Sequence, residues 1–213
     1  MARVEKFLLV MLVSVSPALV WAAGAHSGFL EDYSKLTADP KRPGAESFHA
    51  EGVDLGDYSN ILIDPVEIWY APDSKYKGIS PDELKAVADA FRGILVDALE
   101  PAYPVVSKPG PSVLRVRLAI ANVKMKRKKR GLLSFTPAGF ALTTMRNLAG
   151  KRIVLGDATV EAELMDGSSD ATVGLLVDKL SKTTDDMHSW ETLEQTLQYY
   201  AKRFRTRLDA EHE

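Results

Sequence analysis

The chain has 213 residues, of which 46% are hydrophobic and 26% are charged, and these values are typical of a globular protein. It contains no cysteine, which excludes disulfide bonds, zinc fingers, thiol catalysis and a lipid-modified cysteine anchor. The net charge of −2 conceals an asymmetry, because residues 101–156 hold twelve Lys and Arg and no Asp or Glu. The rest of the chain holds fifteen basic and twenty-nine acidic residues, and this polarity indicates a charged partner surface.

The first 25 residues have the pattern of a secretory signal peptide. Arg3 and Lys6 precede an apolar run over residues 7–20, and a small-residue cleavage site ends at Ala25. We expect cleavage after Ala25 or Ala22 and export to the periplasm or cell envelope, as a protein that is not a lipoprotein. An uncleaved anchor is the second interpretation, although the run is short for a bilayer span.

Residues 26–59 are rich in Gly, Pro, Asp and Ser and carry isolated aromatics. We expect an extended N-terminal arm with little regular structure, which packs these aromatics on a single domain over residues 60–209. The stretch ILIDPVEIWY, residues 61–70, has the composition of a strand. Because Pro65 cannot donate a ladder hydrogen bond, this strand is predicted at a sheet edge or a bulge.

A helix is predicted from Pro81, with Ser80 as its N-cap and Glu83 closing a capping box. Pro101 and Pro104 end it. Its apolar residues form one stripe at helical spacing: Leu84, Val87, Ala88, Phe91, Ile94, Leu95, Ala98 and Leu99.

A short strand at 103–107 and two long strands, at 113–126 and 152–166, follow in the predicted order. Alternate residues of the long strands are expected on the core face: Leu114, Val116, Leu118 and Ile120 in one, and Ala158, Val160, Ala162 and Leu164 in the other. If the two pair antiparallel, Arg115 can face Glu163 and Arg117 can face Glu161. The alternative is that these charged side chains are simply solvated.

The stretch DGSSD, residues 166–170, predicts a hairpin turn into a strand at 171–180. A last helix follows Ser189 as N-cap, with basic residues in its C-terminal half and one apolar side: Trp190, Leu193, Leu197, Tyr200, Ala201, Phe204 and Leu208. The order of elements predicts an α+β fold. We expect an antiparallel sheet of four to five strands with two helices packed on one face, a two-layer sandwich.

Six fragments together resemble one family: SGFLEDYSKL (27–36), ILIDPVEIWY (61–70), GISPDELKAVADAF (78–91), PGPSVLRVRLAI (109–120), DATVEAELMD (157–166) and SWETLEQTLQYYAKRFRTRL (189–208). They look like the bacterial envelope proteins grouped as the domain-of-unknown-function 3313 family, over nearly the whole chain after residue 25. The resemblance implies an exported α+β domain with no established catalytic residues. Many members look like lipoproteins, whereas this chain has no cysteine to acylate, and this departure puts the usual lipid anchor in doubt.

No catalytic or metal-binding motif stands out in the sequence. The four histidines, His26, His49, His188 and His212, have no partner at metal-ligand spacing. Ser74 and Lys77 match the bare S-x-x-K pattern but lie in a loop, and Glu161 and Glu163 share a strand face with arginines as expected partners. We therefore expect no enzyme activity, metal or cofactor. A hydrolase with a cryptic site is the alternative.

The segment 124–152 places the densest positive charge of the chain beside an apolar run. Its candidate contact residues are six basic ones, Lys124, Lys126, Arg127, Lys128, Lys129 and Arg130, and four apolar ones, Leu132, Leu133, Phe135 and Phe140. A helix is predicted within it, from Thr136 to a C-terminal cap at Gly150. Basic residues near an anionic surface contribute about 1 kcal/mol each, and a buried Leu or Phe adds about 1.5–3 kcal/mol.

Three interpretations of this segment are open. It packs as ordinary core with its lysines as solubilising residues, it docks on an outside partner, or it binds nucleic acid, against which export argues. The docking interpretation predicts a non-catalytic exported envelope protein whose partner is an anionic lipid surface or an envelope protein complex. An auxiliary subunit of an envelope transport system would use the same face.

Overall fold

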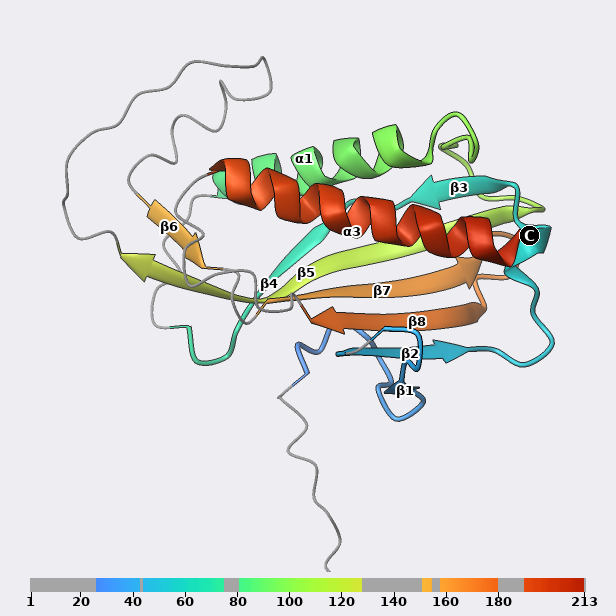
Figure 1. The fold of residues 1–213 in the computed structure, drawn as a ribbon, viewed down its shortest axis with the longest axis horizontal. Coiled ribbons are helices and arrows are strands. Elements are labelled where there is room, and N and C mark those ends of the chain that lie inside the picture. Colours follow the sequence, from blue (N-terminus) through green and yellow to red (C-terminus); the bar gives the residue numbers. More distant parts are fainter. Residues whose placement is uncertain are drawn as a thin grey trace, which may run out of the picture.

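A computed structural model of the chain describes residues 26–42, 44–74, 81–127, 151–154, 158–179 and 190–212. Within these residues, seven strands form one mixed sheet in the order β1-β2-β8-β7-β5-β3, with β4 also paired to β5 (Figure 1). An eighth strand, β6, pairs with the far end of β5. The strands are β1 (Thr37–Ala38), β2 (Ala45–His49), β3 (Asn60–Ile63), β4 (Glu67–Tyr70), β5 (Val113–Arg127), β6 (Lys151–Val154), β7 (Thr159–Asp166) and β8 (Thr172–Lys179).

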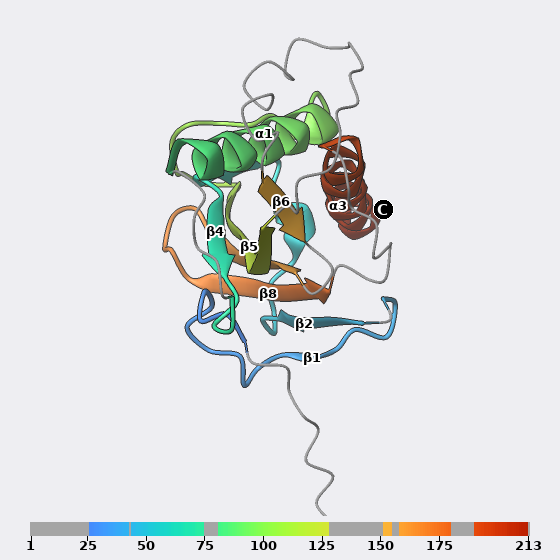
Figure 2. The same ribbon diagram turned by 90° about the vertical axis from the view of Figure 1, so that its left-hand side faces the viewer.

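The two long helices, α1 (Pro81–Leu99) and α3 (Trp190–Glu211), lie side by side on one face of the sheet, as expected (Figures 1 and 2). Both bury described residues of the predicted apolar stripe, among them Phe91 and Leu95 of α1 and Leu197 and Leu208 of α3. A short 3-10 helix, η1 (Leu55–Asp57), contacts α3. The predicted N-caps Ser80 and Ser189 lie outside the described residues.

The core under the helices includes the alternate residues that the sequence placed inward, which lie in β5, in β7 and, for Ala158, directly before β7. Their eight side chains are all buried: Leu114, Val116, Leu118, Ile120, Ala158, Val160, Ala162 and Leu164. The period-2 pattern therefore identified the helix-covered face of both strands correctly.

The expectation of an antiparallel sheet with four to five strands was wrong in two respects. The described sheet has seven strands, and β3 and β4 both run parallel to β5. The physical reason is the connection, because α1 lies between β4 and β5 and a helical crossover returns the chain in the same direction. The remaining pairings of the sheet, β1–β2, β2–β8, β7–β8 and β5–β7, are antiparallel.

Three predicted strands have different bounds in the structure. The strand at 61–70 is divided into β3 and β4 around Pro65, which lacks the ladder donor. Residues 103–107 form no strand and contribute one bridge, between Val105 and Ile61. The strand at 152–166 is divided into β6 and β7, which pair with different parts of β5.

The N-terminal arm contains more regular structure than its composition indicated. Residues 45–49 form β2, which pairs with β8 along its whole length and extends the sheet. Residues 27–36 cross the face of the sheet opposite the helices, where Phe29 and Leu30 are buried against Ala119, Leu175 and Val177 (Figure 2). The prediction that the arm packs its aromatics on the domain is confirmed for Phe29.

The predicted charge pairing was out of register by two residues. β5 and β7 are antiparallel, as expected, but Arg117 lies opposite Glu163, while Arg115 lies opposite Met165. Arg117 donates a 2.6 Å hydrogen bond to Glu163, and Arg115 instead pairs with Asp64 and Asp170. A shift of two residues keeps every side chain on its face, so the alternation of the sequence cannot decide between the two registers.

Candidate functional site

The segment predicted to contact a partner starts and ends in a two-stranded ribbon. β5 pairs with β7 only as far as Ala121, opposite Thr159. From Lys124 to Arg127, β5 pairs with β6 instead, and Arg127 and Lys151 form the last pair. In Figure 1 this β5–β6 ribbon continues beyond the end of the sheet that β7 and β8 form. The chain therefore enters and leaves the segment 128–150 at one end of the molecule.

The ribbon contains three of the predicted contact residues, Lys124, Lys126 and Arg127, all of them in β5. By sequence, five of the eight paired positions of the ribbon are Lys or Arg and none is acidic. The other predicted contact residues lie outside the described residues, as does the helix predicted from Thr136 to Gly150: Lys128, Lys129, Arg130, Leu132, Leu133, Phe135 and Phe140.

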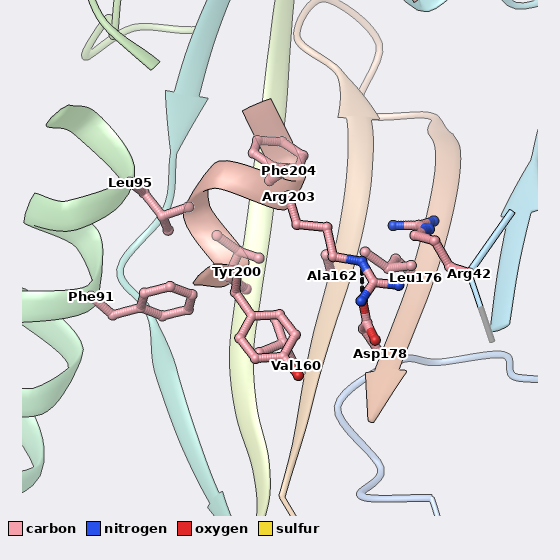
Figure 3. A pocket seen from close by; sticks show the side chains of 11 residues that line it. Arg42, Phe91, Leu95, Val160, Ala162, Leu176, Asp178, Tyr200, Arg203 and Phe204 are labelled. Carbon is pink, nitrogen blue, oxygen red and sulfur yellow. Dashed lines mark ion pairs between the residues drawn. The ribbon is translucent and has the colours of Figure 1, made fainter. Parts of the chain in front are cut away.

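A pocket that the sequence did not predict lies between the two helices and the sheet (Figure 3). Its volume is about 20 Å³. The apolar part of its lining comes from α1, α3 and the strands beneath, and includes Phe91, Leu95, Phe204, Leu118 and Val160. Arg42, from the loop before β2, and Asp178 and Arg203, from β8 and α3, also line it.

The charged side chains at this pocket form a partly buried cluster. Arg203 Nε lies 3.2 Å from a carboxylate oxygen of Asp178, a residue that is 2% exposed. Arg42 donates from Nε to Asp39 over 2.9 Å, and Arg207 approaches the same oxygen of Asp39 within 3.5 Å. Burial raises the pKa of Asp178 above its ordinary value, while the charge of Arg203 opposes this shift.

A second buried acid lies on the opposite face of the sheet. Glu161 is 1% exposed and accepts hydrogen bonds from Tyr33 (2.6 Å), Ser27 (2.9 Å) and Thr159 (3.2 Å). Burial and the bond to Glu161 both raise the pKa of the Tyr33 phenol. The predicted partner of Glu161, Arg117, belongs to Glu163 instead. The N-terminal arm thus supplies the partners of a carboxylate that the sheet buries.

Two histidines of the described residues, His26 and His212, have structural neighbours. His26 stacks on the ring of Tyr33, with centroids 4.0 Å apart, and His212 lies 2.8 Å from the carbonyl oxygen of Leu208. His188 and Lys77 lie outside the described residues. Among the residues that the structure does describe, there is no group of three or more His, Asp or Glu placed to bind a metal ion. Nor does any described helix have the length and apolar character that crossing a membrane requires.

Comparison with known proteins identifies a family but no characterised relative. The model of the family described as "Protein of unknown function (DUF3313)" matches residues 25–204. No curated protein matches the chain.

The solved structures similar to this chain are distant from it in sequence. One is a DUF4136 family protein from Bacteroides thetaiotaomicron, with 9% identity and a TM-score of 0.39, covering 79% of this chain and 96% of that protein. Two are PelC dodecamers from Paraburkholderia phytofirmans, each with 13% identity and a TM-score of 0.36. They cover 73% and 74% of this chain and 96% of PelC.

Proposed function

We propose that this chain, which belongs to the DUF3313 family of proteins of unknown function, is a non-catalytic protein of the bacterial envelope that docks on an anionic membrane through residues 124–152. The observation that carries the proposal is the β5–β6 ribbon. It holds the start of the most basic segment, Lys124 to Arg127, at one end of the described sheet, where β7 no longer accompanies β5.

The described residues cover both faces of the sheet with apolar side chains. One face of the sheet is covered by α1 and α3, and the other is covered in part by Phe29 and Leu30 of the arm. Docking requires the apolar side chains of the segment 128–150, including Leu132 and Phe135, to face the partner rather than the core, and this orientation is part of the proposal.

The charge of the ribbon favours an anionic surface. Five basic positions on two adjacent strands repel one another, and a layer of phosphate groups relieves this repulsion. The six basic residues at 124–130 supply several kcal/mol at about 1 kcal/mol each, and inserted Leu or Phe side chains add to this. The sum exceeds the binding of a single acyl chain, which holds a membrane only marginally. The segment could thus replace the lipid anchor that a chain without cysteine cannot carry.

Sedimentation with lipid vesicles tests the proposal. We expect vesicles containing phosphatidylglycerol to sediment the protein without signal peptide, and vesicles of phosphatidylcholine alone to leave it in solution. Raising the salt from 0.05 to about 0.5 M should release the protein, because exposed charges are then screened. The variant with Lys126, Arg127, Lys128 and Lys129 changed to Ser should lose about 4 kcal/mol of binding, or roughly a thousandfold in affinity.

The matched control removes the same number of basic residues from the body of the domain. Lys41, Arg92, Lys108 and Lys202 are exposed and lie outside the segment, so changing all four to Ser should leave sedimentation close to that of the unchanged protein. Equal loss in both variants would mean that net charge alone causes binding. Sedimentation that is indifferent to lipid charge would contradict membrane docking, and stable capture by an envelope protein complex would replace the lipid with a protein partner.

A further inference from the structure

The pocket between the helices and the sheet combines two arginines with an apolar interior (Figure 3). We propose that it binds a carboxylate that carries a short alkyl chain, with the carboxylate on Arg42 and Arg203 and the chain in the pocket. The proposal is independent of membrane docking, because every residue that lines the pocket lies outside the segment 124–152. Each of the two can therefore fail without the other.

Both arginines are held in place with part of their hydrogen-bonding capacity unused. Arg42 donates from Nε and Nη2 to Asp39, while Arg203 directs Nε to Asp178 and donates from Nη1 to Tyr199. In the described part of the chain, neither Nη1 of Arg42 nor Nη2 of Arg203 has a protein acceptor. Guanidinium N–H groups match the geometry of a carboxylate, so these two free donors are suited to a bound carboxylate.

The charge balance of the cluster favours one bound anion. Arg42, Arg203 and Arg207 carry three positive charges, and Asp39 and Asp178 carry at most two negative charges in return. Nε of Arg207 is buried and donates no hydrogen bond. An excess cation in a partly desolvated site is costly, and a ligand of charge −1 neutralises it.

Asp178 is the group at the pocket that would oppose an anion. It is buried, and burial raises its pKa, which eases its protonation when a second carboxylate binds nearby. Arg203 forms a 3.2 Å ion pair with Asp178. The positive charge of Arg203 further reduces the repulsion between Asp178 and a bound carboxylate.

The size of the pocket limits the apolar part of the ligand. A volume of about 20 Å³ is close to the room that one water molecule needs, so it admits only the terminal methyl group of a short chain and not a long acyl chain. The side chains of Phe91, Leu95, Leu118 and Phe204 form an apolar wall that gives no hydrogen bond to a polar end group. Affinity should therefore rise with chain length over the first carbons and then stop rising.

Two sources share this ligand chemistry, namely a free short-chain acid and the C-terminal residue of a peptide with a small apolar side chain. Pentanoate and N-acetylvaline represent them. Methyl NMR of the chain without its signal peptide reports binding at Leu95, Leu118 and Val160, which line the pocket. Saturable shifts of these methyl signals with either probe support the proposal, and the tighter probe identifies the source.

The ligand series tests both halves of the site without any substitution. Acetate should bind about tenfold or more weakly than pentanoate, since it lacks three methylene groups. Heptanoate should bind no more tightly than pentanoate, and uncharged pentanamide should give no saturable shift. Equal binding of pentanoate and pentanamide, or no saturable shift with either pentanoate or N-acetylvaline, would overturn the proposal.

A pair of variants then assigns the carboxylate contact. Arg42→Gln removes one free donor, and Asp39 keeps Arg207 as a partner, so the fold should survive. We expect this variant to lose about tenfold in pentanoate affinity. Arg92→Gln, at an exposed position of α1, is the control and should bind unchanged. Equal affinities in the two variants would exclude the proposed role of Arg42, and the methyl spectrum verifies that each variant is folded.

Discussion

The phenol of Tyr33 donates a 2.6 Å hydrogen bond to the carboxylate of Glu161, which β7 places on the sheet face opposite the helices. The two residues are 128 positions apart. The same hydroxyl accepts the backbone N–H groups of Gly28 and Leu30, each over 3.1 Å. One side chain thus joins the arm to a buried acid and also fixes the turn of the arm, so the arm is an integral part of the domain.

Tyr33→Phe should therefore destabilise the protein. The substitution keeps the ring and removes one donor from a carboxylate that is 1% exposed, and we expect a loss of about 1–3 kcal/mol in the free energy of unfolding by urea. Tyr199→Phe is the control, because Tyr199 is 53% exposed and its hydroxyl only accepts an exposed hydrogen bond, from Nη1 of Arg203; it should change stability by less than about 0.5 kcal/mol. Equal effects of the two substitutions would contradict the structural role of Tyr33.

Removing Arg203 should destabilise the protein more than removing the carboxylate of Asp178, its partner in the ion pair. The side chain of Asp178 is 3% exposed, whereas that of Arg203 is 20% exposed. Arg203→Gln leaves a buried carboxylate without its cation and should cost about 3 kcal/mol in the free energy of unfolding at pH 7. Asp178→Asn leaves an arginine that still reaches water and should cost less, about 1 kcal/mol.

The direction of the Asp178 pKa adds a pH test to this comparison. A carboxyl whose pKa is raised on folding stabilises the folded state below its unfolded pKa, and this contribution is lost as the pH rises through the folded pKa. Without Arg203 the pKa of Asp178 rises further, because that arginine opposes the shift. The loss in the free energy of unfolding that Arg203→Gln causes should consequently be larger at pH 7 than at pH 4. Urea unfolding of the variant and of the unchanged protein at both pH values measures this loss. A loss independent of pH would mean that Asp178 is not the group responsible.

The raised pKa of Tyr58 leads us to expect a loss of stability at alkaline pH. Burial and the hydrogen bond that its hydroxyl donates to Asp166 raise its pKa to about 12. A phenol with a raised pKa contributes stability that is complete below about pH 10, the unfolded pKa, and is lost as the pH rises through the folded pKa. Between pH 10 and 12 the free energy of unfolding should fall less steeply in Tyr58→Phe than in the unchanged protein. Parallel curves would show that Tyr58 titrates alike in both states.

The local elements and their faces follow from the sequence alone. Pro81 and Pro101 bracket α1, whose observed bounds are Pro81–Leu99, because proline fits the first turn of a helix but cannot continue one. The alternation through Leu114, Val116 and Leu118 identified the core face of β5 because side chains alternate across a strand. The matched family was indicated by fragments along the whole chain.

Pairing partners and directions were decided only by the tertiary structure. Alternation is unchanged by a shift of two residues, which is why Arg117 could be assigned to Glu161 when the sheet places it beside Glu163. The direction of β3 depends on the path of α1, and β2 joins the sheet through backbone hydrogen bonds to β8 that composition does not encode.

The same distinction holds for the candidate sites. The charge of residues 124–130 is visible in the sequence, and the structure added that Lys124 to Arg127 pair with β6 at one end of the described sheet. The pocket has no sequence signature, because Arg42, Asp178 and Arg203 come from three separate elements. Sequence determines which faces of each element avoid water, since that depends on neighbours within a few residues. Which charged groups come into contact depends on how the strands of the whole sheet pair, and only the folded chain decides that pairing.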